Sequence, residues 1–500
     1  MMEQEQKFFK SDEQSDELSD KQYAKIKKAL KEARGQGIAL NRVEGDLWVD
    51  LSELGRLLMQ EHVDEQGDGD LGPTIDHEGK TLNRLETRYE KRYVSVFGEL
   101  RIIRTVYGTR ESQKHELVPL DARLNLPEGD FSFLLQDWSQ AFCVQGSYKQ
   151  SGETIEKILG IGQSVRSLEH MNGAMARDVE EFHASQSEPA AEEEGPILVL
   201  TADGKGIPMR RENPLENPPG RRGKGDKANK KRMACVGAAY TIQPFVREAK
   251  DVVEDLHRQE LKEERPQPLH KRMRAELTRE IEGEEVNGKD RIFRWFRETA
   301  AARNPDGEKA VVCLMDGERA LWKKAEDYGV DAVCILDIYH VLERLWSAAY
   351  CFLAEGSQDA EAFVTERLTR LLKGQVGRVI GGLKQMMNKQ ALRGTKKKQL
   401  QAVITYMENN RDSMQYDYYL EMGYPIGSGV VEGACRHLVK DRMEGTGMRW
   451  RTEGAQSMLD LRAVYLNGDW KDFQEYRVEQ NVRKLYPYRE MIQELWSIAA

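Results

Sequence analysis

The sequence has few cysteines, and no two of them stand at a metal-binding spacing. The six cysteines are scattered over 500 residues, and none belongs to a CxxC motif. Cys235, Cys313 and Cys334 lie inside apolar runs and are expected to be small core residues. We therefore expect neither disulfides nor a structural zinc site.

Long hydrophobic runs are also absent. Charged residues interrupt every stretch of about 18 residues, which argues against a membrane-spanning helix. The N-terminal stretch MMEQEQKFFKSDEQSDE is acidic and lacks the apolar core of a signal peptide. These absences predict a cytoplasmic protein with no membrane partner.

The chain lacks the positive net charge that is common in DNA-binding proteins, because its formal charge is −9. The distribution of charge is uneven, however. Residues 210–232 contain nine Lys/Arg and three Asp/Glu, a local charge of +6, whereas the acidic excess lies in stretches such as 12–20 and 192–194. A local basic stretch suits contacts with phosphate groups.

The N-terminal third is expected to be mostly helical. Residues 21–34 and a stretch near 51–63 have helical patterns, and 93–108 alternates like a β-hairpin that turns at Gly98-Glu99. A plain structural hairpin is at least as good an interpretation of 93–108 as a DNA-contacting one.

Residues 131–182 have the pattern of a helix-turn-helix. A helix over 131–145 is followed by a second, with Ser151 as its expected N-cap and Gly160 as its stop, and then by a tight turn and a third helix. Ordinary helix packing is the alternative to DNA binding. If the motif binds a major groove, the contacting residues are Ser164, Arg166, Ser167 and His170.

A linker over 184–196 precedes an α/β pattern. Continuous apolar runs are typical of strands buried on both faces. Four such runs span 197–203, 233–242, 310–316 and 332–337. Helices are expected at 269–281, at 290–302 and over most of 341–411.

Two of the apolar runs end in an aspartate followed by glycine, Asp203 and Asp316. Such carboxylates would face the sheet edge where ligands of α/β folds gather. Glu432 follows PIGSG in the first turn of a helix, and Arg436 and Lys440 would share its face in a continuous α-helix. A turn aspartate and a solvated glutamate are the plain alternatives.

Three carboxylates would suit hard divalent cations. Mg²⁺ (or Mn²⁺) prefers oxygen ligands, and two such ions support an in-line displacement at phosphorus. Arg436 and Lys440 would then hold phosphate groups nearby.

Three ordered segments resemble bacterial insertion-sequence transposases of the ISKra group. The segments are TADGKGIPMRR with GKGDKANKKRMACVGAAYTI, CLMDGERALW, and PIGSGVVEGACRHLVKDRMEGTGMRW. The resemblance implies an RNase-H-like catalytic core, two divalent metal ions and DNA ends as substrate. Carried over by position, it assigns the catalytic and metal-binding triad to Asp203, Asp316 and Glu432.

Asp337 and His340 resemble the Asp-x-x-His pair of several eukaryotic-type DDE transposases, in which the histidine would orient the scissile phosphate. A structural histidine bound to Asp337 is the alternative. The long interval between His340 and Glu432 implies an inserted helical domain, and related insertions contact DNA. Trp346 is a candidate contact there, unless it is a core residue.

The basic stretch after Asp203 is expected to form a loop that contacts DNA, and a solvated loop is the alternative. The candidate residues are Arg210, Arg211, Arg221, Arg222, Lys224, Lys227, Lys230, Lys231 and Arg232.

The sequence therefore predicts an α/β RNase-H-like catalytic core, a mixed sheet flanked by helices, with a helical insertion and a mostly α N-terminal DNA-binding region. The expected parts are an N-terminal region with the hairpin (1–130), a helix-turn-helix-like domain (131–183), the linker (184–196), the core (197–345 and 421–468), the insertion (346–420) and a helical tail (469–500).

The predicted function is that of an insertion-sequence DNA transposase. It would bind double-stranded DNA, both the terminal inverted repeats and the target, and catalyse Mg²⁺-dependent cleavage and strand transfer. A homodimer or larger synaptic assembly, in a bacterial cytoplasm and associated with the nucleoid, is expected. The alternatives are a catalytically retired transposase that still binds DNA and, less well matched, a two-carboxylate glycosidase.

Overall fold

The computed structural model describes residues 2–109, 116–210, 231–256, 265–390 and 392–499. The chain forms two compact units, one made of Met1–Asp178 with Trp470–Ala500 and the other of Val179–Asp469. None of the helices in the described ranges combines the length and apolar character needed to cross a bilayer.

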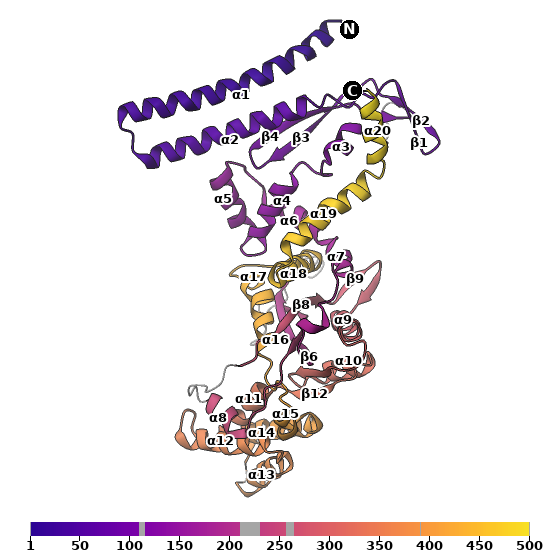
Figure 1. Cartoon of the computed structure of the whole chain (residues 1–500). Helices are drawn as coiled ribbons and strands as arrows, with labels where there is room; N and C mark the ends of the chain where they lie inside the picture. Colours follow the sequence, from indigo (N-terminus) through magenta and orange to yellow (C-terminus); the bar gives the residue numbers. More distant parts are fainter. Residues whose placement is uncertain (1, 110–115, 211–230, 257–264, 391, 500) are drawn as a thin grey trace, which may run out of the picture. The chain divides into compact units, whose positions relative to one another are not determined.

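The first unit begins with two helices that pack against each other, α1 (Met2–Gln36) and α2 (Leu40–Asp64) (Figure 1). The helix expected at 21–34 is therefore the C-terminal part of a longer one. A hairpin not predicted from the sequence, β1 (Thr74–His77) with β2 (Lys80–Arg84), is extended by β5 (Tyr107–Gly108).

The hairpin expected over 93–108 is present, but its turn lies two residues earlier than predicted. β3 (Tyr89–Ser95) pairs with β4 (Gly98–Arg104), and Ser95 lies opposite Gly98. The loop is therefore Val96-Phe97 instead of Gly98-Glu99. Gly98 has a φ of 128°, so it closes the turn in a backbone conformation that favours glycine, and does not form its tip.

Three helices occupy the predicted helix-turn-helix region, α4 (Phe133–Cys143), α5 (Tyr148–Leu159) and α6 (Val165–Ala176). The N-cap of α5 is Ser147, which accepts a hydrogen bond from the Gln150 amide, and the predicted cap Ser151 is buried within the helix. Gly160 ends α5 with a φ of 71°, as expected. The unit is completed by α3 (Pro119–Leu124), α19 (Trp470–Leu485) and α20 (Arg489–Ala499).

The second unit contains a mixed five-stranded sheet with the order β12-β11-β6-β7-β8. Its strands are β6 (Ile197–Pro208), β7 (Lys231–Ile242), β8 (Leu269–Leu277), β11 (Ala310–Met315) and β12 (Val333–Leu336). β6, β11 and β12 run parallel, whereas β7 and β8 pair antiparallel. The four predicted strands and the mixed character of the sheet are confirmed.

The helix predicted at 269–281 is wrong. These residues form the edge strand β8 and then β9 (Arg279–Ile281), which pairs with β10 (Glu284–Val286). LHKRMRAEL is rich in helix-forming residues, but Met273, Ala275 and Leu277 alternate with polar side chains and are buried. The period of two therefore outweighs the helix propensity.

Helices cover both faces of the sheet, so the strands are apolar throughout. One face, with Leu198 and Leu200, packs on α9 (Gly288–Arg303) and α10 (Arg319–Asp327). The other, with Val199 and Leu314, packs on the helices that follow β12. These helices are α11 (Ile338–Ala349), α12 (Gln358–Leu372), α13 (Val376–Lys389), α14 (Gly394–Asn409) and α15 (Tyr416–Glu421), together with α8 (Ala249–Leu256).

Side chains occupy both edges of this sheet. Along β8, the Asn467 amide bonds both backbone groups of Met273, at 2.9 and 3.2 Å. Gln456 accepts from the Leu277 amide and donates to the Ala275 carbonyl. Along β12, the hydroxyls of Tyr416 and Tyr419 donate to the carbonyls of Leu336 and Cys334. Side chains thus bond these edge groups in place of a further strand.

The remaining elements of this unit are short, apart from one long helix. After the loop at 422–428 the chain forms α16 (Gly429–Ala434), a π-helical turn η3 (Cys435–Lys440), α17 (Asp441–Met443) and α18 (Thr452–Asn467). Elsewhere lie α7 (Val179–Ser185), η1 (Ala191–Glu193) and η2 (Arg411–Ser413). Glu194, in the predicted linker, forms an ion pair with Arg303 in which both side chains are 1% exposed.

Candidate metal centre

The parallel register places three aspartates side by side. Met315 of β11 lies opposite Ala202 of β6 and Leu336 of β12, so the next residue of each strand is Asp203, Asp316 or Asp337. Neighbouring strands are about 4.8 Å apart. The sheet therefore brings three carboxylate-bearing residues to one level of three adjacent strands.

Asp203 does not end its strand, as the sequence had suggested. β6 continues to Pro208, and Asp203 pairs with Val236 of β7. The parallel pairing of β6 with β11 does end just before Asp203, at Ala202. By the alternation of strand residues, Asp203 and Asp316 share the sheet face of Val199 and Leu314, on which the helices α11 to α15 pack.

Asp337 is the best anchored of the aspartates. Its side chain is 0% exposed and caps α11 by accepting a hydrogen bond from the Tyr339 amide at 2.9 Å. It also accepts from the amide and hydroxyl of Ser428 and contacts His340 Nδ1 at 3.0 Å. Both carboxylate oxygens are therefore occupied by partners from α11 and from the loop before α16.

His340 carries positive charge into this group. Its hydrogen bond with Asp337 is the main cause that raises the pKa of His340 to about 9. The imidazole side chain is 29% exposed, and Nε2 is left for another partner when Nδ1 contacts Asp337. The histidine is therefore a cationic hydrogen-bond donor near neutral pH.

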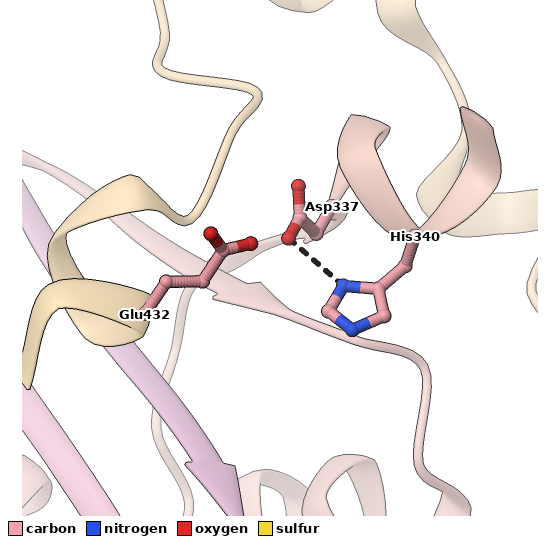
Figure 2. Close-up of side chains that lie close together, drawn as sticks. All are labelled: Asp337, His340 and Glu432. Carbon is pink, nitrogen blue, oxygen red and sulfur yellow. Dashed lines mark hydrogen bonds and ion pairs between the residues drawn. The ribbon is translucent and has the colours of Figure 1, made fainter. Parts of the chain in front are cut away.

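Glu432 reaches the same place from α16 (Figure 2). A ligand atom of Glu432 lies within 4.8 Å of one from Asp337 and one from His340. Burial, and then the charge of Asp337, raises the pKa of Glu432. Asp203 and Asp316 do not belong to this closest group, but the charge of Asp203 contributes to the raised pKa of Glu432.

The contacts of Asp316 tie it to the inserted helices. Its carboxylate accepts from the Glu318 amide at 2.8 Å, and its carbonyl accepts from the hydroxyl of Tyr406 in α14. Burial raises the pKa of Asp316, and the nearby charge of Asp203 adds to it. Gly317 has a φ of 88°, and a Cβ there would collide with Leu336, so this sharp turn requires glycine.

The described partners of the Asp203 carboxylate, a backbone amide and a thiol, are uncharged. The carboxylate bonds the Gly204 amide at 2.6 Å and lies 3.5 Å from the Cys435 thiol, whose pKa is raised by burial. Among the described residues, no Lys or Arg forms an ion pair with Asp203, Asp316 or Glu432. The charge of His340 offsets part of the repulsion among these carboxylates, and a bound metal ion would relieve the rest.

Arg436 and Lys440 lie on a π-helical turn, Cys435–Lys440, that the sequence did not predict. Both side chains are exposed, and Arg436 lies 3.7 Å from Asp441. Their role in holding phosphate groups beside Glu432 stays a prediction.

The predicted DNA contacts are only partly placed. Arg211, Arg221, Arg222, Lys224, Lys227 and Lys230 lie outside the described residues. Lys231 pairs with Glu444 at 3.1 Å, Arg232 donates to the Thr452 hydroxyl, and the Arg210 amide bonds Trp450. In the first unit, Ser164 caps α6 through the Ser167 amide, while Arg166 and His170 are exposed.

The sequence interpretation missed a second basic region. Residues 373–407 contain eight Lys/Arg and no Asp/Glu. All eight side chains are exposed on α13, α14 and their flanks, and among them only Lys384 forms a described ion pair, with Glu408. A count of acids along the sequence would have revealed this region. Trp346, on α11, is partly buried against the core, and its ring centroid lies 5.8 Å from that of Tyr350.

The residues therefore form an acidic cluster beside three parallel strands, and oxygen ligands of this kind suit a hard divalent cation. No family model matches the chain, and no curated protein matches it. Among solved structures, the chain is similar to the Drosophila P element transposase strand transfer complex, with a TM-score of 0.24 and 10% identity over 71% of this chain and 84% of that chain. That TM-score does not establish a shared fold.

Proposed function

We propose that the chain is a DDE-type DNA transposase of the insertion-sequence kind, with an RNase-H-like core. The observation that carries the proposal is the in-register placement of Asp203, Asp316 and Asp337, with Glu432 directed at the same level. Rigid strands hold the aspartates, while the catalytic work would fall to Asp203, Asp316 and Glu432.

The donor set fits two Mg²⁺ (or Mn²⁺) ions. Carboxylates without basic partners are the ligands these cations prefer, and the saturated Asp337 would act as the support and not as a ligand. When bound, such a pair activates an attacking oxygen and stabilises the leaving one. His340, held by Asp337, would donate from Nε2 to a phosphate oxygen of the scissile strand.

The DNA partner is supported by the basic region 373–407. Eight exposed cations with no intervening acid, in a chain of net charge −9, form a surface suited to a polyanion. Because the inserted helices share a core with the sheet and Tyr406 bonds the Asp316 carbonyl, DNA on this surface would be guided toward the carboxylates. Two element ends must be cut, so a homodimer or larger assembly is proposed.

The catalytic test compares three isosteric variants on DNA that carries the element ends. Asp316→Asn and Glu432→Gln should lower the rate of Mg²⁺-dependent cleavage at least about a hundredfold and reduce Mn²⁺ binding in calorimetry. Their affinity for DNA should stay equal or rise, because each removes a charge that repels phosphate. Glu343→Gln is the matched control, since this exposed acid acts on the pKa of Glu432 without belonging to the proposed ligands. Wild-type cleavage by either ligand variant refutes the triad.

The DNA-binding test uses salt dependence. Replacing Lys396, Lys397 and Lys398 by Gln should weaken binding to any duplex and lower the slope of log K against log salt by about 0.9 for each phosphate that is no longer neutralised. The control replaces three exposed lysines elsewhere, Lys250, Lys323 and Lys471. An unchanged slope in the first variant would show that α14 faces solvent in the complex.

A further inference from the structure

A second polar cavity lies on the opposite face of the sheet from the aspartates. It has a volume of about 60 Å³ and is lined by β8, α9, the segment after α7 and the end of α18. Arg274, in its wall, pairs with Gly237 of β7, and Gly237 faces Phe296 of α9. Because Asp203 points to the other face, the cavity is separate from the proposed metal centre.

Arg274 brings an uncompensated charge into this cavity. The other two arginines of the lining have partners: Arg272 pairs with Asp469, and Arg303 with Glu194. Arg274 forms no hydrogen bond or ion pair with any residue that the structure describes, and its guanidinium stacks 4.9 Å from the Trp295 ring. Burial lowers the pKa of Arg274.

The acids around Arg274 do not neutralise it by contact. Its pKa responds to Glu180, Glu276, Glu298 and Asp460 at longer range. Glu180 and Glu276 are themselves paired with Arg291. A partly desolvated guanidinium without an oxygen partner is unfavourable, and a small anion in the cavity would offset that cost.

His183 supplies a second unsatisfied group. Its Nε2 is buried and has no hydrogen-bond partner among the described atoms. Burial, followed by the charges of Arg274 and Arg272, lowers the pKa of His183 to about 3, so the ring is neutral at physiological pH. With its proton on Nε2, the neutral imidazole is a donor that requires an acceptor.

We propose that this cavity binds a single tetrahedral oxyanion, a phosphate group, held by Arg274 and by His183 Nε2–H. The volume is of the order of one small oxyanion. Arg274 of β8 and His183 of α7 both line the cavity, and a guanidinium matches the geometry of phosphate oxygens. A water molecule could satisfy the histidine, but it would leave the arginine charge without a counterion.

The position of the cavity gives such a ligand a structural consequence. His183 lies on α7, the first segment of this unit, and Arg274 lies on β8 of the sheet. A phosphate held by both would therefore fasten the segment where the chain enters the unit to the sheet. This role does not depend on the carboxylates or on cleavage.

The proposal is tested by calorimetry of the full chain with inorganic phosphate at constant ionic strength. Wild type should bind one equivalent, and Arg274→Gln should lower the affinity at least about tenfold, the loss expected for a charge-assisted hydrogen bond. Arg297→Gln, an exposed arginine of α9, is the matched control and should bind like wild type. Asp316→Asn should also retain phosphate binding, which separates this test from that of the catalytic proposal.

Two further variants keep the test decisive if Arg274→Gln unfolds. His183→Phe keeps a ring of similar shape without the donor and should weaken phosphate binding, whereas Glu188→Gln removes an acid of the lining and should strengthen it. Competition by duplex DNA would identify a DNA phosphate as the source, and its failure a free ion. Binding that is absent in wild type, or equal in wild type, Arg274→Gln and His183→Phe, overturns the proposal.

Discussion

Replacing Asp337 by asparagine should destabilise the second unit strongly, although the side chain keeps its size. One oxygen can still accept from the amides of Tyr339 and Ser428. The new amide group, however, would face the Ser428 hydroxyl and the protonated Nδ1 of His340, both of which donate to the carboxylate. The His340 N–H and the Ser428 O–H would then point at the N–H groups of the new amide, and neither could keep its present hydrogen bond.

The expected magnitude follows from these hydrogen bonds. Two charge-assisted bonds are removed, each worth about 1.5–3 kcal/mol, in a site where Asp337 is 0% exposed. The free energy of unfolding of the unit should therefore fall by about 3–5 kcal/mol. Ser428→Ala alone should cost about 2 kcal/mol, and the double variant should cost less than the sum, because both changes remove the same bond.

Urea unfolding near pH 7 measures these differences, and hydrogen exchange localises them. The Ile338 amide, which donates to the Ile426 carbonyl at 2.9 Å, should lose protection in Asp337→Asn, because its neighbour no longer fixes the loop before α16. A decrease below about 1 kcal/mol, or strict additivity with Ser428→Ala, would refute the view that Asp337 joins α11 to that loop.

Three other perturbations have predictable signs. Gly288→Ala should cost about 1–3 kcal/mol in thermal unfolding, because a Cβ would overlap the carbonyl of Glu276; a neutral result would mean that α9 can shift. Glu194→Gln should cost about 3–5 kcal/mol in urea, because Arg303 would keep a charge that is 1% exposed. Burial, and then the charge of Glu276, raises the pKa of Asp460 to about 7, so wild type should lose stability as the pH rises from about 4 to 7. Asp460→Asn should abolish that slope and be more stable at pH 8 by up to about 4 kcal/mol, and parallel pH profiles would contradict this reasoning.

The sequence was informative where burial alone determines structure. The runs that became β6, β7, β11 and β12 are apolar because helices cover both of their faces, and this composition is visible in the letters. It failed at β8, whose outer residues Arg272 and Arg274 are charged because they line a cavity at the sheet edge. At β8, charged residues with high helix propensity therefore hide the alternating pattern of a strand.

The site shows a similar division. The residue types and the order of Asp203, Asp316 and Glu432 come from the sequence, but their relation in space depends on strand register, which no local pattern contains. Nor could the sequence reveal that Ser428 saturates Asp337, a contact across 91 residues. The π-helical turn over Cys435–Lys440 has no composition that distinguishes it from an α-helix, so the sequence could not reveal it.

The side chains that occupy the sheet edges restrict how this molecule can associate with itself. A strand from a second copy could join β8 only by displacing Asn467 and Gln456, and could join β12 only by displacing Tyr416 and Tyr419. Exposed strand edges are the usual template for open-ended stacking of chains. The proposed dimer is therefore not expected to form by extension of the five-stranded sheet, and this sheet is protected against open-ended stacking with other copies.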